Sequence, residues 1–161
     1  MKAAIITSSD KGYAGEREDV SGQVMEDMLK AAGYEVIRKI VLPDEKQMLA
    51  DEMKKMCEEG ADLIMTTGGT GFSKRDVTPE ATKMVIEKEA RGITDAILFY
   101  SLSITPRAML SRAIAGIRGE TLIVNLPGSP KAVKESLEYV LPALGHGLGI
   151  LRGTENECGN C

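Results

Sequence analysis

The sequence predicts an α/β fold, a three-layer sandwich in which helices cover both faces of a mostly parallel, mixed β-sheet. Two observations support this prediction. Short apolar runs alternate along the chain with segments whose apolar residues recur every three to four positions, the pattern of buried strands between amphipathic helices. Near the end of the chain, two strand-like runs flank Arg118-Gly119-Glu120, a turn typical of a hairpin, and this antiparallel pair makes the sheet mixed.

The first half of the chain predicts three strands separated by two helices. In chain order these are a strand over 2–7, a helix over 22–32, a strand over 34–42, a helix over 45–59 and a strand over 61–66. Ser21 is placed to cap the first helix and Gly33 to end it. Asp44, with Gln47 three residues later, resembles the capping box of the second helix.

The second half predicts three further helices and the hairpin. In chain order these are helices over 78–88 and 93–103, strands over 113–117 and 121–126, and a long helix over 130–151. Thr78 and Pro79 suit the N-cap and first position of their helix, and Pro142 is expected to kink the last one. Without repeats or linkers, we expect a single domain over residues 1–152, followed by a flexible C-terminal tail over residues 153–161.

Composition excludes several classes of function. A net charge of -4 argues against broad binding to nucleic acid. No apolar run reaches the roughly 18 residues that a membrane-spanning helix needs. The N-terminus lacks the pattern of a signal peptide. We therefore expect a cytoplasmic protein that binds neither nucleic acid nor a membrane.

The three cysteines give little information about function. Cys57 lies in a helical pattern, where we expect it to be buried or half-buried. Cys158 and Cys161 form a C-x-x-C pair at the end of the chain. Because there is no second pair and His146 lies at no standard ligand spacing, we interpret the pair as tail thiols, with half of a metal site as the alternative.

A glycine-rich loop follows the strand predicted over 61–66. It begins with Thr66-Thr67-Gly68-Gly69-Thr70-Gly71, and Asp76 follows five residues later. Its glycines expose backbone N–H groups with almost no side-chain bulk, which suits the oxygens of a phosphate. It matches neither a Walker A loop nor G-x-G-x-x-G. The alternative interpretation is a tight turn that merely requires glycine.

Polar segments follow four of the predicted strands. They are Ser8-Ser9-Asp10, Pro43-Asp44-Glu45, the loop from Thr67 to Asp76, and Pro127-Gly128-Ser129-Pro130. In an open α/β sheet, ligands bind outside the carboxyl ends of the strands. The sequence therefore predicts that these segments meet in one active site, although the last of them is also consistent with a rigid connection.

Asp44 and Asp76 are candidate ligands for a hydrated Mg²⁺ ion, which takes one or two protein carboxylates and fills its shell with phosphate oxygens and waters. Each acid also has a structural interpretation. Asp44 is placed to cap a helix, and Asp76 is placed to balance Arg75 or the following helix N-terminus. Ser111 has no histidine partner that would make it the nucleophile of a catalytic triad. From the sequence alone we interpret it as a capping or surface hydroxyl.

Several motifs, in the same order along the chain, resemble the molybdopterin adenylyltransferase (Mog/MoaB) family of molybdenum cofactor biosynthesis. These motifs are Thr67-Gly68-Gly69-Thr70-Gly71, Arg75 to Thr82, Ala108 to Arg112, Gly116-Ile117-Arg118 and Asn125-Leu126-Pro127-Gly128. The resemblance runs from about Lys2 to Leu151 and implies the molybdopterin-binding, MogA-like fold. It further implies Mg²⁺-dependent attack of the terminal phosphate of molybdopterin on ATP, giving adenylyl-molybdopterin and pyrophosphate.

The resemblance also implies roles for individual residues. Asp44, Asp76 and Ser111 match catalytic positions, and the two acids match ligands of the metal and nucleotide. The residues matched to loops that bind substrate or nucleotide are Ser8, Ser9, Asp10, Thr67, Gly68, Gly69, Thr70, Gly71, Pro127 and Gly128. The family implies a homotrimer and a transient contact with the enzyme that inserts molybdenum. The alternative function is a MoaB-type trimer that binds molybdopterin or acts as a scaffold without turnover.

Overall fold

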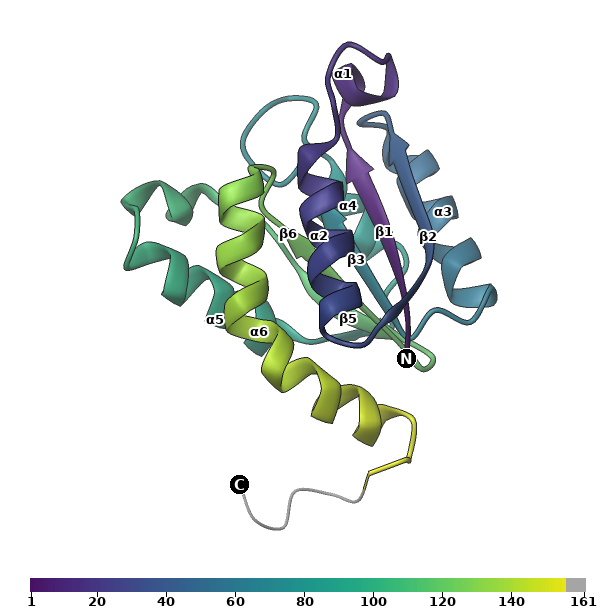
Figure 1. Ribbon diagram of the computed structural model, residues 1–161. Coiled ribbons are helices and arrows are strands. Elements are labelled where there is room, and N and C mark those ends of the chain that lie inside the picture. Colours follow the sequence, from purple (N-terminus) through teal and green to yellow (C-terminus); the bar gives the residue numbers. More distant parts are fainter. Residues whose placement is uncertain (156–161) are drawn as a thin grey trace.

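The structure is a computed structural model in which residues 1–155 are described, and it contains one six-stranded sheet between two layers of helices (Figure 1). The strands are β1 (Lys2–Ser8), β2 (Glu35–Leu42), β3 (Leu63–Thr67), β4 (Lys88–Glu89), β5 (Ala115–Arg118) and β6 (Thr121–Leu126). The helices are α1 (Asp10–Tyr13), α2 (Val20–Ala31), α3 (Lys46–Glu58), α4 (Thr78–Lys83), α5 (Arg91–Leu102) and α6 (Pro130–Leu151), with a 3-10 helix, η1, over Pro106–Leu110.

The sheet is mostly parallel and mixed, as the sequence predicts. Its strand order is β2-β1-β3-β6-β5-β4. β1 pairs in parallel with β2 and β3, and β3 pairs in parallel with β6. β5 runs antiparallel to β6 and also pairs with the short edge strand β4. The parallel strands therefore end at the same edge of the sheet.

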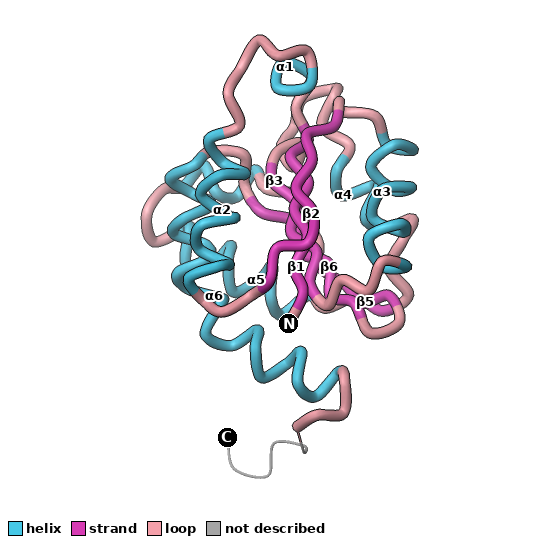
Figure 2. The backbone as a smooth tube through the Cα atoms, turned by 45° about the vertical axis from the view of Figure 1, so that its right-hand side comes forward, coloured by secondary structure: helices cyan, strands magenta, loops and turns pink. Residues whose placement is uncertain are grey.

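Each face of the sheet carries its own apolar core, which confirms the three layers. Along β1, Ile5 packs with residues of α2, α5 and α6, whereas Ile6 packs with residues of α3 and α4. Figure 2 shows these two groups of helices on opposite sides of the strands. Because β1 and β3 are buried on both faces, they form continuous apolar runs in the sequence rather than alternating ones.

The segment after the glycine loop differs from its predicted structure. The helix that begins at Thr78 ends at Lys83 rather than at residue 88, and residues 88–89 form β4. The cause is pairing with β5, since Glu87 N–H donates to the Ile117 carbonyl at 2.8 Å and Ala90 N–H donates to the Ala115 carbonyl at 2.8 Å. Sheet pairing over a long sequence distance thus overrides the local helical pattern.

Two short helices lie outside the helices that the sequence predicts. Ser9 caps α1, because its Oγ accepts a hydrogen bond from Gly12 N–H at 3.0 Å. Thr105 caps η1 in the same way. The long helix α6 continues through Pro142 and changes direction along its length (Figure 1). None of the helices within residues 1–155 is long and apolar enough to cross a membrane.

The cysteine predictions have separate outcomes. Cys57 is half-buried, as expected, and burial raises the pKa of its thiol. Cys158 and Cys161 lie outside the described residues.

Asn125, at the end of β6, is fully buried and joins three segments. Its Nδ2 donates to Thr66 Oγ1 at 3.0 Å and to Thr82 Oγ1 at 2.8 Å, while its Oδ1 accepts from Ile114 N–H at 3.2 Å. We expect Asn125→Leu to lower the free energy of unfolding by about 3 kcal/mol, because it removes the donor to the fully buried Thr66 and Thr82 hydroxyls and the acceptor of the Ile114 N–H.

Urea unfolding measures this effect, and Ile123→Val in the same buried strand is the matched control, with an expected loss of about 1 kcal/mol. If Asn125→Leu cost no more than Ile123→Val, this polar network would not be important for the stability of the fold.

Candidate active site

The segments that follow the four parallel strands lie beside one another at the carboxyl edge of the sheet. Ser8 is opposite Leu42, Thr7 is opposite Thr67, and Thr67 is opposite Leu126 in the register of the strands. The chain therefore brings residues from four distant parts of the sequence to one rim.

Two cavities open at this rim on either side of the glycine loop. The larger cavity has a volume of about 640 Å³. The predicted site residues that line this cavity and not the other are Ser8, Ser9, Asp44 and Thr67. The smaller cavity has a volume of about 460 Å³, and the predicted site residues that line only this one are Thr70, Gly71, Ser111 and Pro127. Gly68, Gly69, Asp76 and Gly128 line both cavities. Among the predicted site residues, Asp10 lines neither.

The glycines of the loop allow close approach of several oxygen atoms. Gly68 has a φ of 86° and Gly69 a φ of 63°, a conformation that other residues adopt only with strain. A Cβ on Gly68 would lie 2.3 Å from the Ser8 carbonyl oxygen. A Cβ on Gly69 would lie 3.1 Å from Asp44 Oδ1, and one on Gly71 would lie 2.9 Å from Asp76 Oδ2. The loop is therefore more than a tight turn, because its glycines make room for both acids.

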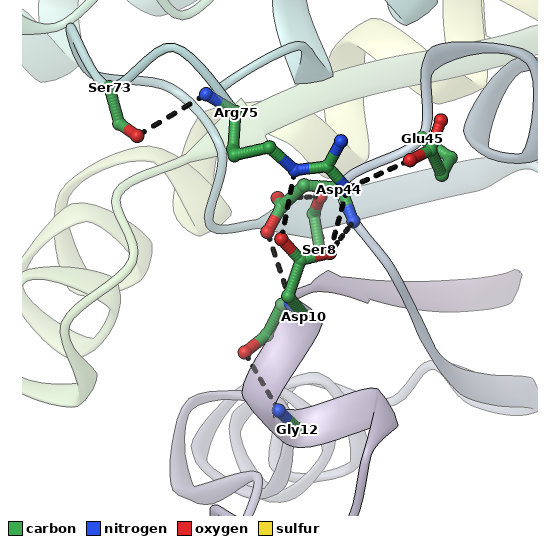
Figure 3. Close-up of polar contacts among 8 residues, drawn as sticks. Ser8, Asp10, Gly12, Asp44, Glu45, Ser73 and Arg75 are labelled. Carbon is green, nitrogen blue, oxygen red and sulfur yellow. Dashed lines mark hydrogen bonds and ion pairs between the residues drawn. The ribbon is translucent and has the colours of Figure 1, made fainter.

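The Asp44 carboxylate faces the rim and does not cap α3. Its Oδ1 accepts the Ser8 hydroxyl at 2.6 Å, and its Oδ2 accepts the Asp10 N–H at 3.1 Å (Figure 3). The N-cap of α3 is Glu45, without a side-chain hydrogen bond, and the Gln47 side chain donates to Asp51 instead. The capping-box prediction was wrong because donors from the loop after β1 reach this carboxylate.

Ser21 is also misassigned by its sequence position. Asp19 caps α2, accepting from Gly22 N–H at 2.9 Å, and the Ser21 hydroxyl donates to the Gly128 carbonyl at 2.8 Å. The Thr67 hydroxyl donates to the neighbouring Pro127 carbonyl at 2.6 Å. Two hydroxyls thus anchor the Pro127-Gly128 turn at the junction of the cavities, and sequence reasoning missed Ser21 as a part of this rim.

The loop that carries Asp76 is held by Arg112. The Arg112 guanidinium donates to the Gly71 carbonyl at 2.7 Å and to the Asp76 carbonyl at 2.8 Å, and it also pairs with Glu80. Asp76 Oδ2 accepts from Ser73 N–H at 3.2 Å. Arg112 was missed as a site residue, although its place in the Ala108 to Arg112 motif was a usable signal.

Arg75 does not pair with Asp76, contrary to one structural interpretation of that acid. Its guanidinium contacts Asp10 and Glu45 (Figure 3). This guanidinium and then the Asp44 N–H hold the pKa of Asp10 below its usual value, and the two acids raise the pKa of Arg75. The negative charge of Asp10 is therefore maintained at the rim.

Ser111 lies just after η1 and lines the smaller cavity. Its Oγ accepts from Ala113 N–H at 3.3 Å, so it has a local structural contact as well as access to the cavity.

Thr78 was not recognised from the sequence as a site residue. Within residues 1–155 its fully buried hydroxyl has no hydrogen-bond partner. This hydroxyl oxygen lies 2.4 Å from the position that a Cβ on Gly69 would take.

The comparison with known proteins identifies the family of this chain. Residues 4–146 match the family model described as "Probable molybdopterin binding domain". The chain belongs to this family. The family resemblance inferred from the motifs is thereby confirmed.

Individual members of the molybdopterin-binding family are similar over nearly the whole chain. A molybdopterin adenylyltransferase from Helicobacter pylori (strain J99) is 39% identical over 92% of this chain and 86% of its own length. Gephyrin from Dictyostelium discoideum is 43% identical over 91% of this chain, which spans only 22% of gephyrin. The crystal structure of the molybdopterin biosynthesis enzyme MoaB from Thermus thermophilus has a TM-score of 0.89 at 44% identity, covering 94% of this chain and 96% of that one. The fold prediction is therefore confirmed.

Proposed function

We propose that this protein is a molybdopterin adenylyltransferase of molybdenum cofactor biosynthesis. It would transfer the adenylyl group of ATP to the terminal phosphate of molybdopterin and release pyrophosphate. The observation that carries the proposal is the position of Asp76 and the glycine loop between two cavities, with Asp44 beside the loop. Relatives that carry this enzyme name at 39% and 35% identity support it.

The proposed reaction requires no protein nucleophile. An oxygen of the molybdopterin phosphate forms a bond to the α-phosphorus of ATP, and the bond from that phosphorus to the pyrophosphate oxygen breaks. The protein then has to align two anionic substrates and stabilise their charge. Backbone N–H groups of residues 68–71 are our candidates for holding phosphate oxygens, and Ser111 is our candidate for a hydroxyl contact from the smaller cavity.

The residues at this junction fit a hydrated Mg²⁺ ion. Within residues 1–155 no group of three or more Asp, Glu, His and Cys side chains is arranged to hold a metal ion by itself, whereas Mg²⁺ requires only one or two carboxylates when phosphates and waters supply the rest. The Thr78 hydroxyl, which is buried and has no hydrogen-bond partner in the described part of the chain, lies beside Gly69 together with the Asp44 and Ser8 side-chain oxygens. We propose that Asp44 and Asp76 hold the ion, which when bound would offset the charge of the phosphates.

Two cavities joined at one loop offer room for two substrates. Ser8, Ser9, Asp44 and Thr67 border the larger, and Ser111 and Pro127 border the smaller. We propose that ATP and molybdopterin occupy this pair of cavities with their phosphates meeting at Gly68 and Gly69. Asp10, outside both linings, would then act through the loop it anchors.

We further propose that the protein is cytoplasmic and that it forms a homotrimer. The association of subunits is supported by an exposed apolar surface on α5 and η1, where Phe99 is 77% exposed and Met109 is 62% exposed. Sedimentation equilibrium distinguishes a trimer from a monomer. A transient contact with the molybdenum-inserting enzyme would deliver the adenylate.

The second candidate function is the MoaB-type alternative, and the chain is also similar to a protein named MoaB, from Thermus thermophilus. In this alternative the protein binds molybdopterin or acts as a scaffold without turnover. The presence of both Asp44 and Asp76 favours catalysis, because binding of the pterin alone does not require a pair of metal ligands.

Release of pyrophosphate tests the proposal. With ATP and Mg²⁺, we expect pyrophosphate to appear only when molybdopterin is also present, and to require the metal. Release without molybdopterin would indicate a simple ATP hydrolase, and no release from folded protein would favour the alternative of binding without turnover.

A further inference from the structure

We propose that Arg75 is a positioning residue for the transfer reaction. It ties the loop that carries Asp76 to the loops that carry Asp10 and Asp44, and so fixes Asp44 and Asp76 relative to each other. This inference rests on the proposed adenylyl transfer.

Arg75 joins three loops that follow three different strands. Its Nε donates to Asp10 Oδ2 at 3.0 Å and its Nη2 to Asp10 Oδ1 at 3.0 Å, a bidentate pair (Figure 3). The same Nη2 donates to Glu45 Oε1 at 2.8 Å. Asp10 follows β1, Glu45 follows β2 and Arg75 lies in the loop after β3. One guanidinium therefore links the rim across three neighbouring strands.

Asp10 transmits this contact to Asp44. The Asp10 Oδ1 that accepts from Arg75 also accepts the Asp44 N–H at 3.0 Å, and the Asp10 N–H donates to Asp44 Oδ2 at 3.1 Å. The two acids thus fix each other through reciprocal contacts between side chain and backbone. The Ser8 hydroxyl fixes the other Asp44 oxygen. With Arg75 removed, the Asp10 carboxylate would lose both guanidinium N–H donors and would hold the Asp44 N–H less firmly.

The loop around Asp76 is thereby held on two sides. Arg112 contacts the Asp76 carbonyl from the side of the smaller cavity. Arg75, the residue before Asp76, reaches in the other direction to the loops after β1 and β2. Because the guanidinium is already paired with two carboxylates, we assign it to holding the loops rather than to binding a phosphate.

The exposure of the Arg75–Asp10 ion pair indicates that the pair positions the loops without contributing much to the free energy of folding. The side chains of Arg75 and Asp10 are 52% and 45% exposed, and exposed ion pairs contribute little to the free energy of folding. The bidentate geometry, however, is specific to arginine, because a lysine ammonium cannot donate through a planar fork. Loss of Arg75 should therefore alter the geometry of the rim without unfolding the protein.

The test compares Arg75→Met and Arg75→Lys with Lys74→Met. Lys74→Met removes the same charge one residue away, on a side chain that makes no hydrogen bond or ion pair within residues 1–155. We expect both Arg75 variants to lower kcat by about 10-fold or more, since small displacements at a reacting centre have effects of this size. The KM for ATP and the melting temperature should change little, the latter by less than about 4 °C. Lys74→Met should behave like the wild type.

A readout independent of activity accompanies the kinetics. By NMR, Arg75→Met should weaken the protection of the Asp44 amide from hydrogen exchange, whereas Lys74→Met should leave it unchanged. Equal losses of kcat in Arg75→Met and Lys74→Met would overturn the inference, as would an unchanged Asp44 amide. An inactive wild type would instead refute the proposed function, and the NMR comparison would still decide whether Arg75 holds Asp44.

Discussion

Asp76→Asn is expected to lower kcat by about 10²- to 10³-fold while leaving the protein folded. The asparagine has nearly the same size, and its side-chain oxygen can still accept the Ser73 N–H. What is lost is a negative charge at the junction of the two cavities, where we propose that the metal and the triphosphate lie. Asp44→Asn should have a comparable effect, because Asp44 is the second proposed ligand.

Steady-state kinetics over a range of Mg²⁺ concentrations measure the effect of these substitutions. The Asn variants should require more Mg²⁺ for half-maximal rate. The unfolding curve of Asp76→Asn should match the wild type, whereas Asp44→Asn should be somewhat less stable because its amide nitrogen cannot accept one of the two hydrogen bonds that the carboxylate accepts. Asp51→Asn, on the exposed side of α3, is the matched control for loss of a carboxylate and should retain full activity. Full turnover by Asp76→Asn would refute the assignment of Asp76 to the metal even if the enzyme activity itself were established.

Gly68→Ala is expected to destabilise the protein by about 3 kcal/mol and to abolish most activity. Part of the loss comes from the φ of 86°, which costs an alanine about 1 kcal/mol. The larger part comes from the Ser8 carbonyl oxygen, 2.3 Å from the position of the new Cβ. The Ser8 carbonyl is a main-chain group and the position of a Cβ is fixed by its own main chain, so the loops after β1 and β3 would have to separate. Ser8 would then be displaced together with its contact to Asp44.

Gly33→Ala is the control for the cost in stability of the positive φ alone. Gly33 has a φ of 87°, and among the described residues no atom outside its chain neighbours comes within 4 Å of an added Cβ. Its substitution should cost only about 1 kcal/mol and leave activity intact. Urea unfolding of the two variants isolates the effect of the close approach. Equal destabilisation would mean that the glycine at position 68 serves the turn alone.

The fold was predictable because its main features are local in the sequence. Apolar runs buried on both faces of the sheet mark β1 and β3, and the turn at residues 118–120 marks the pair β5 and β6. The short strand β4 was not predictable, because its pairing with β5 joins residues far apart in the chain. The local sequence there favours a helix, and only the tertiary contact decides against it.

The position of the site was predictable for the same reason, since parallel strands bring their carboxyl ends to one rim. The hydrogen-bond partners of individual side chains were not predictable from the sequence. Asp44 has a convincing local capping pattern, yet its donors come from residues 34 and 36 positions away. Arg75 reaches 65 positions back to Asp10. Such contacts leave no periodic signal in one sequence, so the hydrogen-bonded network of the rim emerges only in three dimensions.

The most direct test of the central claim is to identify the product made by the wild-type protein. We expect mass spectrometry of a reaction with molybdopterin, ATP and Mg²⁺ to detect adenylyl-molybdopterin, in an amount equal to the pyrophosphate released. A folded protein that binds molybdopterin but forms no adenylate under these conditions would contradict the account and establish binding without turnover.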